Sequence, residues 1–101
     1  MLGFIKKLFG PGVDLIEKMS EGAIIVDVRS PGEYAGAHVK GSKNIPLDKI
    51  SGKMETIKKW NRPVITCCAS GMRSGSAAII LKKNGVEAYN VGPWQKADKL
   101  A

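Results

Sequence analysis

The apolar residues of the chain fall into two kinds of pattern, and the first is the short continuous run. Residues 23–28 (AIIVDV) and 64–67 (VITC) are rich in β-branched side chains, which is typical of strands buried on both faces of a sheet. Residues 88–91 (AYNV) form a third run, and residues 42–47 (SKNIPL) predict a short strand that Pro46 stops. These runs predict a central sheet.

The second pattern repeats every three to four residues and predicts helices. It covers residues 13–19, 50–57 and 74–83, and a last helix is expected from about residue 94. Ser30-Pro31-Gly32-Glu33 has the sequence of a capping box, which places a short helix after the first strand. Because strands and helices alternate, we expect an α/β fold with a central parallel sheet of about five short strands and helices on both faces.

The first twelve residues differ from the rest of the chain. Within residues 1–9, apolar side chains fall on one side of a short helix and Lys6 and Lys7 on the other, before Gly10-Pro11-Gly12 interrupts the pattern. Two interpretations stay open: a terminal helix that covers the core, or an anchor that contacts a partner or a membrane surface. We therefore divide the chain into an N-terminal amphipathic segment and linker, residues 1–12, and one domain, residues 13–101.

The length and charge of the chain argue against several classes of function. A chain of 101 residues makes one domain, without an apolar run near the ~20 residues of a membrane span and without a signal-peptide cleavage pattern, so a cytoplasmic monomer is expected. The net charge is +7, but the lysines are scattered, and the three arginines and six aromatic residues are not interleaved as in a nucleic-acid site. The excess charge suits the steering of small anions, and nucleic acid is not an expected partner.

The two cysteines, Cys67 and Cys68, are adjacent. This spacing excludes a loop-closing disulfide and the usual zinc motifs, and no metal or other cofactor is expected. In the cytoplasm both thiols would stay reduced. Since successive residues of a strand point to opposite faces, we expect Cys67 in the core and Cys68 facing the loop that follows.

The segment best suited to chemistry is Cys68-Ala69-Ser70-Gly71-Met72-Arg73-Ser74, between a buried strand and a helix. At the carboxyl end of a strand, the N–H groups of a small-residue loop and of the next helix attract negative charge. Arg73 would add a full positive charge, and Ser74 would either donate its hydroxyl to a bound anion or cap the helix. These conditions lower the pKa of a cysteine thiol and favour a reactive thiolate at neutral pH.

These residues resemble those of the rhodanese-like sulfurtransferases. The resemblance covers nearly the whole chain after Gly12 and rests on several motifs in the same order. They are Asp27-Val28-Arg29, Glu33-Tyr34, His38-Val39, Asn44-Ile45-Pro46-Leu47, Val64-Ile65, Cys68 with Ser70-Gly71, Arg73-Ser74 and Ala77-Ala78. The resemblance implies the rhodanese-like α/β fold and a six-residue active loop that begins at Cys68 and ends at Arg73.

The resemblance also implies a reaction, the transfer of sulfane sulfur. Cys68 would take sulfur from a donor such as thiosulfate, polysulfide or a persulfide, hold it as a persulfide, and pass it to a thiol or cyanide. The anionic sulfur would be bound by the backbone N–H groups of Ala69, Ser70, Gly71, Met72 and Arg73. Family members that prefer thiosulfate often carry Arg or Lys after the cysteine, where this chain has Ala69, so a less charged donor fits the loop equally well.

Two other functions stay open. Counted from Cys67, the segment reads C-x5-R-S, the spacing of cysteine-dependent phosphatases. That signature usually has His where this chain has Thr66, and no acid loop is recognisable. A non-catalytic rhodanese-like module would instead bind a partner through its basic surface or through residues 1–9.

Four residues outside the loop have structural interpretations. Asp27 and Arg29 flank the end of a strand, and Arg29 is expected to reach Glu33. His38 lies where the resemblance implies a structural histidine, and Trp94 is expected to pack in the core.

Overall fold

The computed structural model describes residues 13–101, so the expectations for residues 1–12 lie outside the described residues. Parallel strands form one sheet in the order β2-β1-β3-β4. Their bounds are β1 Ile24–Asp27, β2 Lys43–Asn44, β3 Val64–Cys68 and β4 Ala88–Pro93. The expected α/β fold is confirmed, with four strands in this sheet where about five were expected.

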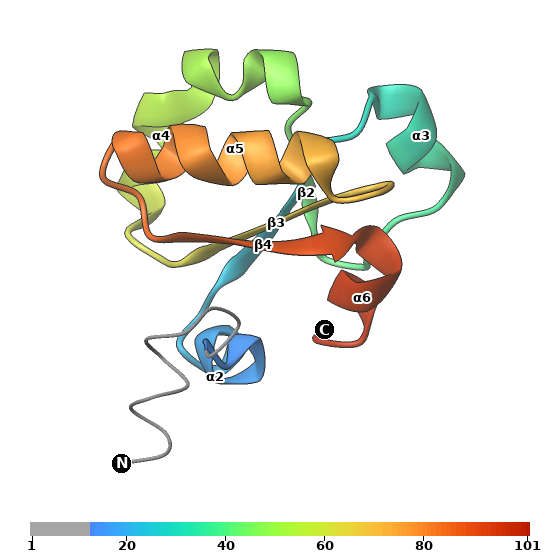
Figure 1. Ribbon diagram of the computed structural model, residues 1–101, viewed down its shortest axis with the longest axis horizontal. Helices are drawn as coiled ribbons and strands as arrows, with labels where there is room; N and C mark the ends of the chain where they lie inside the picture. The colour runs from blue at the N-terminus through green and yellow to red at the C-terminus, as the bar shows by residue number, and fades with distance from the viewer. Residues whose placement is uncertain (1–12) are drawn as a thin grey trace.

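Helices cover both faces of the sheet (Figure 1). One face packs against α4 (Met54–Trp60) and α5 (Met72–Lys83), and the other against α2 (Leu15–Ser20) and α6 (Trp94–Asp98). The connections after β1 and β2 contain α3 (Pro31–Gly36) and two short 3-10 helices, η1 (Leu47–Lys49) and η2 (Ser51–Lys53). The sheet therefore separates two apolar clusters.

Strand β3 shows how the sheet divides the core. All five of its residues are buried. Val64 and Cys68 belong to the cluster under α4 and α5, whereas Ile65 and Cys67 belong to the cluster beside α2 and α6. This alternation follows from the two-residue period of a strand, and it confirms that the two cysteines point to opposite faces.

Two boundaries differ from the expected ones near the loop after β3. The strand expected over 42–47 is limited to Lys43–Asn44, because Pro46 has no backbone N–H and the chain turns into η1. Helix α5 begins at Met72, two residues before Ser74, because Gly71 takes the cap position in a left-handed conformation with φ 104°. The capping box of Ser30 and Glu33 at the start of α3 is present as predicted.

The expectation that Arg29 reaches Glu33 is wrong, because the turn after β1 brings Arg29 back to Asp27. The Arg29 N–H donates to Asp27 Oδ1 at 3.0 Å, and Arg29 Nη2 lies 2.7 Å from Asp27 Oδ2. The same nitrogen donates to the Ala37 carbonyl at 2.6 Å, and the guanidinium lies over the Trp94 ring. Both charged side chains are buried, so this pair fixes the geometry where β1, α3 and α6 meet.

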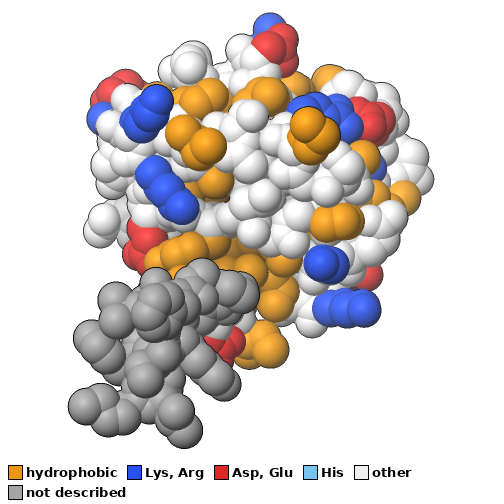
Figure 2. All heavy atoms as spheres, in the orientation of Figure 1, with side chains coloured by type: hydrophobic (Ala, Val, Ile, Leu, Met, Phe, Trp, Pro, Cys, Tyr) orange, Lys and Arg blue, Asp and Glu red, His pale blue; other side chains and the backbone are white. Residues whose placement is uncertain are grey.

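Within residues 13–101, no helix is both long enough and apolar enough to cross a membrane. The same part of the chain has no group of three His, Cys, Asp or Glu side chains placed to hold a metal ion. On the face drawn in Figure 2, Lys and Arg side chains are spread out and do not form one continuous patch. The positive charge of that face is therefore dispersed.

Candidate active site

The loop after β3 wraps around the sulfur of Cys68. Cys68 is the last residue of β3 and is buried. Three donors reach its Sγ: the Gly71 N–H at 2.9 Å, the Ser74 N–H at 3.4 Å and the Ser74 hydroxyl at 3.3 Å. Donors that converge on a sulfur stabilise its thiolate form relative to the thiol.

Opposing effects act on the pKa of the Cys68 thiol. Burial raises this pKa, whereas hydrogen bonds from the Ser74 hydroxyl and from the N–H groups of Ser74, Gly71 and Ser70 lower it. The hydrogen bonds outweigh burial, so the pKa of Cys68 lies below that of an ordinary cysteine. Cys68 therefore becomes a nucleophilic thiolate at a lower pH than a free thiol does.

The backbone path of the loop depends on Gly71. Its φ of 104° is one that side chains rarely adopt, and a Cβ there would lie 3.2 Å from the Cα of Gly92 on β4. Any larger residue at position 71 would strain the backbone and crowd β4. Glycine thus allows the chain to aim the 71 N–H at the Cys68 sulfur and to begin α5 immediately afterwards.

The other predicted loop residues lie closer to the surface. Ala69 and Ser70 are exposed, and Met72 is 80% exposed. The Met72 N–H, one of the groups predicted to bind an anion, lies 3.4 Å from Ser70 Oγ. Ser74 does not cap α5, because Gly71 holds the cap position, and its hydroxyl instead reaches the Cys68 sulfur.

Arg73 is held by Glu33 of α3. Arg73 Nη1 donates to Glu33 Oε1 at 2.7 Å, and Nη2 donates to Oε2 at 3.1 Å. The bonds from Arg73, with that from the Ser30 N–H, lower the pKa of Glu33 to about 2. The full positive charge expected from Arg73 at the end of the loop is therefore shared with a carboxylate.

Cys67 has the opposite surroundings. Its side chain packs in the cluster that includes Ile25, Ile65 and Ala97. Burial, and secondly the negative charge of Asp27, raise the pKa of Cys67 to about 12. A thiol with this pKa stays protonated at neutral pH, so the surroundings of Cys67 favour a core residue over a nucleophile.

Comparison with known proteins identifies the family of this chain. Residues 13–92 match the sequence profile of the rhodanese-like domain. The chain belongs to the rhodanese-like family. A crystal structure of a rhodanese-like domain protein from Staphylococcus aureus shares this fold, with a TM-score of 0.70, 34% sequence identity and 83% of each chain covered.

Two relatives show how much of this rhodanese-like chain is shared with other proteins. The uncharacterized protein YqhL of Bacillus subtilis (strain 168) is 41% identical over 70 residues, which are 68% of this chain and 55% of YqhL. The thiosulfate sulfurtransferase GlpE of Pseudoalteromonas translucida is 33% identical over 75 residues, which are 74% of this chain and 69% of GlpE. The chain thus spans about half the length of YqhL.

In this rhodanese-like domain, the rings of His38 and Trp94 pack against other residues of the fold, as predicted. The His38 ring stacks on Tyr34 with centroids 3.8 Å apart, and its Nδ1 lies 2.7 Å from the Tyr34 carbonyl oxygen. Trp94 packs against the cluster beside α2 and α6 and against the Arg29 guanidinium. Neither ring is among the groups that contact the Cys68 sulfur.

Two residues that were not predicted as site residues support the loop. Asn90 Nδ2 donates to the Gly71 carbonyl at 3.1 Å, and Asn90 Oδ1 accepts from the Gly92 N–H at 2.9 Å. Thr66 Oγ1 donates to the Ser74 carbonyl at 2.8 Å. Only the turn from Asn90 to Gly92 has a local sequence signal, because Asn side chains often bond the backbone two residues on.

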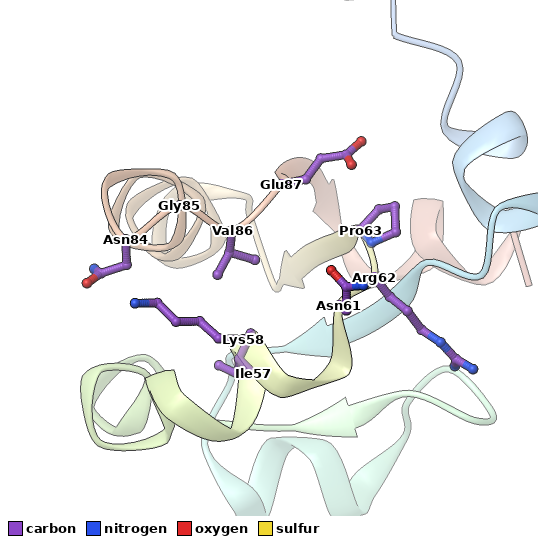
Figure 3. A pocket seen from close by; sticks show the side chains of 9 residues that line it. All are labelled: Ile57, Lys58, Asn61, Arg62, Pro63, Asn84, Gly85, Val86 and Glu87. Carbon is purple, nitrogen blue, oxygen red and sulfur yellow. The ribbon is translucent and has the colours of Figure 1, made fainter.

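Two cavities lie at opposite ends of the strands. The first, of about 620 Å³, shares Arg73 with the active loop. The second, of about 250 Å³, lies at the amino ends of β3 and β4 (Figure 3). In the second cavity Lys58 and Arg62 point away from each other, and Glu87 is paired with Lys18. Its charged groups do not converge, so the first cavity is the one relevant to the site.

Proposed function

We propose that this rhodanese-like chain is a sulfurtransferase that carries sulfane sulfur on Cys68. The observation that carries the proposal is the convergence of the Gly71 N–H, the Ser74 N–H and the Ser74 hydroxyl on the Cys68 sulfur. Relatives named thiosulfate sulfurtransferase support it at the family level, including PspE of Escherichia coli (strain K12), 38% identical over 61 residues. Thiosulfate, polysulfide and persulfides are the candidate donors.

The reaction balances without a separate oxidant or reductant. With thiosulfate, the Cys68 thiolate attacks the outer sulfur, the S–S bond of thiosulfate breaks, and sulfite leaves with the bonding electron pair. The new persulfide keeps one negative charge, which the donors around the sulfur are placed to stabilise. Attack by cyanide on the terminal sulfur then releases thiocyanate and restores the Cys68 thiolate; a thiol acceptor would leave as a persulfide.

The test is the intact mass of the protein after incubation with thiosulfate or polysulfide. We expect one added sulfur atom on the wild type and on Cys67→Ala, removed by cyanide, and none on Cys68→Ala. Absence of the adduct from the wild type would favour a non-catalytic binding module. An undiminished adduct on Cys68→Ala would assign the sulfur to another residue.

A phosphatase that uses Cys67 is the weaker alternative. Its nucleophile would be a buried core thiol with a pKa raised to about 12. Turnover of p-nitrophenyl phosphate that disappears in Cys67→Ala and persists in Cys68→Ala would favour it.

We also propose that the protein acts in the cytoplasm. Both cysteines are free thiols in the structure, and the cytoplasm is a compartment in which thiols stay reduced.

A further inference from the structure

Strand β3 contains one hydroxyl group, that of Thr66. The other side chains of the strand are Val64, Ile65, Cys67 and Cys68. Thr66 is 0% exposed, and valine has the same branched shape and an equal preference for a buried strand. A buried hydroxyl costs free energy unless it is hydrogen-bonded. The bond that Thr66 makes is therefore what distinguishes it from valine at this position.

The Thr66 hydroxyl joins β3 to the first turn of α5, which lies along this face of the sheet (Figure 1). Thr66 Oγ1 donates to the Ser74 carbonyl at 2.8 Å and lies 3.4 Å from the Tyr89 carbonyl of β4. A hydroxyl has one proton to donate, so the shorter contact makes Ser74 its main acceptor. Thr66 thus fastens the start of α5 to the strand that carries Cys68 two residues later.

The residue that Thr66 holds supplies two of the three donors to the Cys68 sulfur. The Ser74 hydroxyl lies 3.3 Å and the Ser74 N–H 3.4 Å from Sγ, both farther away than the Gly71 N–H at 2.9 Å. Thr66 and Cys68 point to the same face of β3, since they are two residues apart. Hydrogen bonds weaken with distance, so a small movement of the first turn of α5 away from β3 would lose both Ser74 donors.

We propose that Thr66 is a positioning residue of the active site, whose hydroxyl holds Ser74 where its N–H and its hydroxyl both donate to the Cys68 sulfur. The third donor is held separately, because Asn90 bonds the Gly71 carbonyl from β4. Loss of the Thr66 hydroxyl should weaken the two Ser74 donors and leave the Gly71 donor in place. The consequence for sulfur transfer rests on the proposed function, in which these donors stabilise the thiolate and the persulfide.

The test is the pH profile of iodoacetamide alkylation in the Cys67→Ala background, where Cys68 is the only thiol. Thr66→Val removes the hydroxyl and keeps the shape of the side chain. We expect the midpoint of its profile to rise by about half a pH unit, which slows alkylation about threefold at a pH below the midpoint. Thr56→Val makes the same change at an exposed position of α4 and should leave the profile unchanged.

A second pair of variants separates the hydroxyl from the packing of the side chain. Thr66→Ser keeps the hydroxyl and loses a methyl group, so it should unfold at a lower urea concentration but keep the midpoint of the background. Thr66→Ala loses both groups and should show the raised midpoint of Thr66→Val. The pair of Arg73 and Glu33 beside the loop is the same in every variant. A Thr66→Val profile that overlays the background, or an equal rise in Thr66→Ser and Thr66→Ala, would overturn the inference.

The role of Thr66 and the transfer of sulfur can fail separately, because alkylation is measured without a sulfur donor. A midpoint that rises in Thr66→Val but not in Thr66→Ser, with no sulfur adduct on the wild type, supports the positioning role and refutes the transfer. A sulfur adduct on the wild type, with the same midpoint in Thr66→Val and the background, supports the transfer and refutes the positioning role.

Discussion

The two faces of β3 give adjacent cysteines opposite chemistry. On one face Cys68 ends the strand where the loop turns back, and three donors meet its sulfur. On the other face Cys67 packs among aliphatic side chains, near the charge of Asp27. The pKa falls below the ordinary value for Cys68 and rises to about 12 for Cys67. The direction in which the strand points each thiol therefore sets its surroundings.

The largest expected effect is on thiol alkylation. At pH 7 a thiol with a pKa of about 12 has a thiolate fraction on the order of 10⁻⁵, so Cys68→Ala should slow labelling by iodoacetamide by at least about 10³-fold. Cys67→Ala should label at close to the wild-type rate and lose about 1 kcal/mol of stability in urea unfolding, since it removes a small buried group. If labelling stopped in Cys67→Ala and persisted in Cys68→Ala, Cys67 would be the reactive thiol.

A smaller effect is expected from the donors on the Cys68 side. Ser74→Ala removes the hydroxyl that lies 3.3 Å from the sulfur and leaves the backbone donors in place. Because that bond stabilises the thiolate, alkylation at pH 7 should slow on the order of tenfold. The difference should narrow at high pH, where the thiol ionises in both proteins.

The matched control for this prediction is Ser76→Ala, which deletes an exposed hydroxyl from the same helix. It should leave the whole pH profile of alkylation unchanged. A Ser74→Ala profile that overlays the wild type would show that backbone N–H groups alone set the ionisation of Cys68.

The smallest effect concerns the ion pair between Arg73 and Glu33 at the rim of the loop. The folded-state pKa of Glu33 is lowered from 4.5 to about 2, so its contribution to stability is present above pH 4.5 and is lost as the pH falls toward 2. Wild type should therefore be slightly more stable than Glu33→Gln at pH 6, with the difference disappearing in that acidic window. Urea unfolding at a series of pH values measures it.

Glu55→Gln, which removes an exposed carboxylate 4.0 Å from Lys58 on α4, controls for the change in net charge. A difference between wild type and Glu33→Gln that persists unchanged at pH 2 would mean that the two residues do not form a charged pair in solution.

The features that the sequence predicted well are those with a local cause. The β-branched run of β3 places its residues on alternating faces, and the Ser30 to Glu33 spacing creates a capping box within one turn. The expectation that Cys67 and Cys68 point to opposite faces followed from the strand that holds them. Each of these depends on residues that are neighbours along the chain.

The features that the sequence did not predict join distant segments. Glu33 is 40 residues from Arg73, and Asn90 is 19 residues from Gly71. Local spacing assigned Glu33 to its capping role and, wrongly, to a contact with Arg29. Glu33 also accepts from Arg73, because β1 and β3 are parallel neighbours and their carboxyl ends lead into α3 and α5 on the same end of the sheet. The cavity that shares Arg73 with the active loop has the same origin, since its walls follow three different strands.

The close approach of Gly71 to Gly92 limits which substitutions this chain can accept during evolution. An alanine at position 71 meets the Cα of Gly92 at 3.2 Å, and position 92 is already occupied by the smallest residue. No second-site suppressor at position 92 can therefore make room, and retreat of β4 would break the bond from Asn90 to the Gly71 carbonyl. We expect a mutational scan to find tolerance at exposed Ala69 and Met72 and none at Gly71.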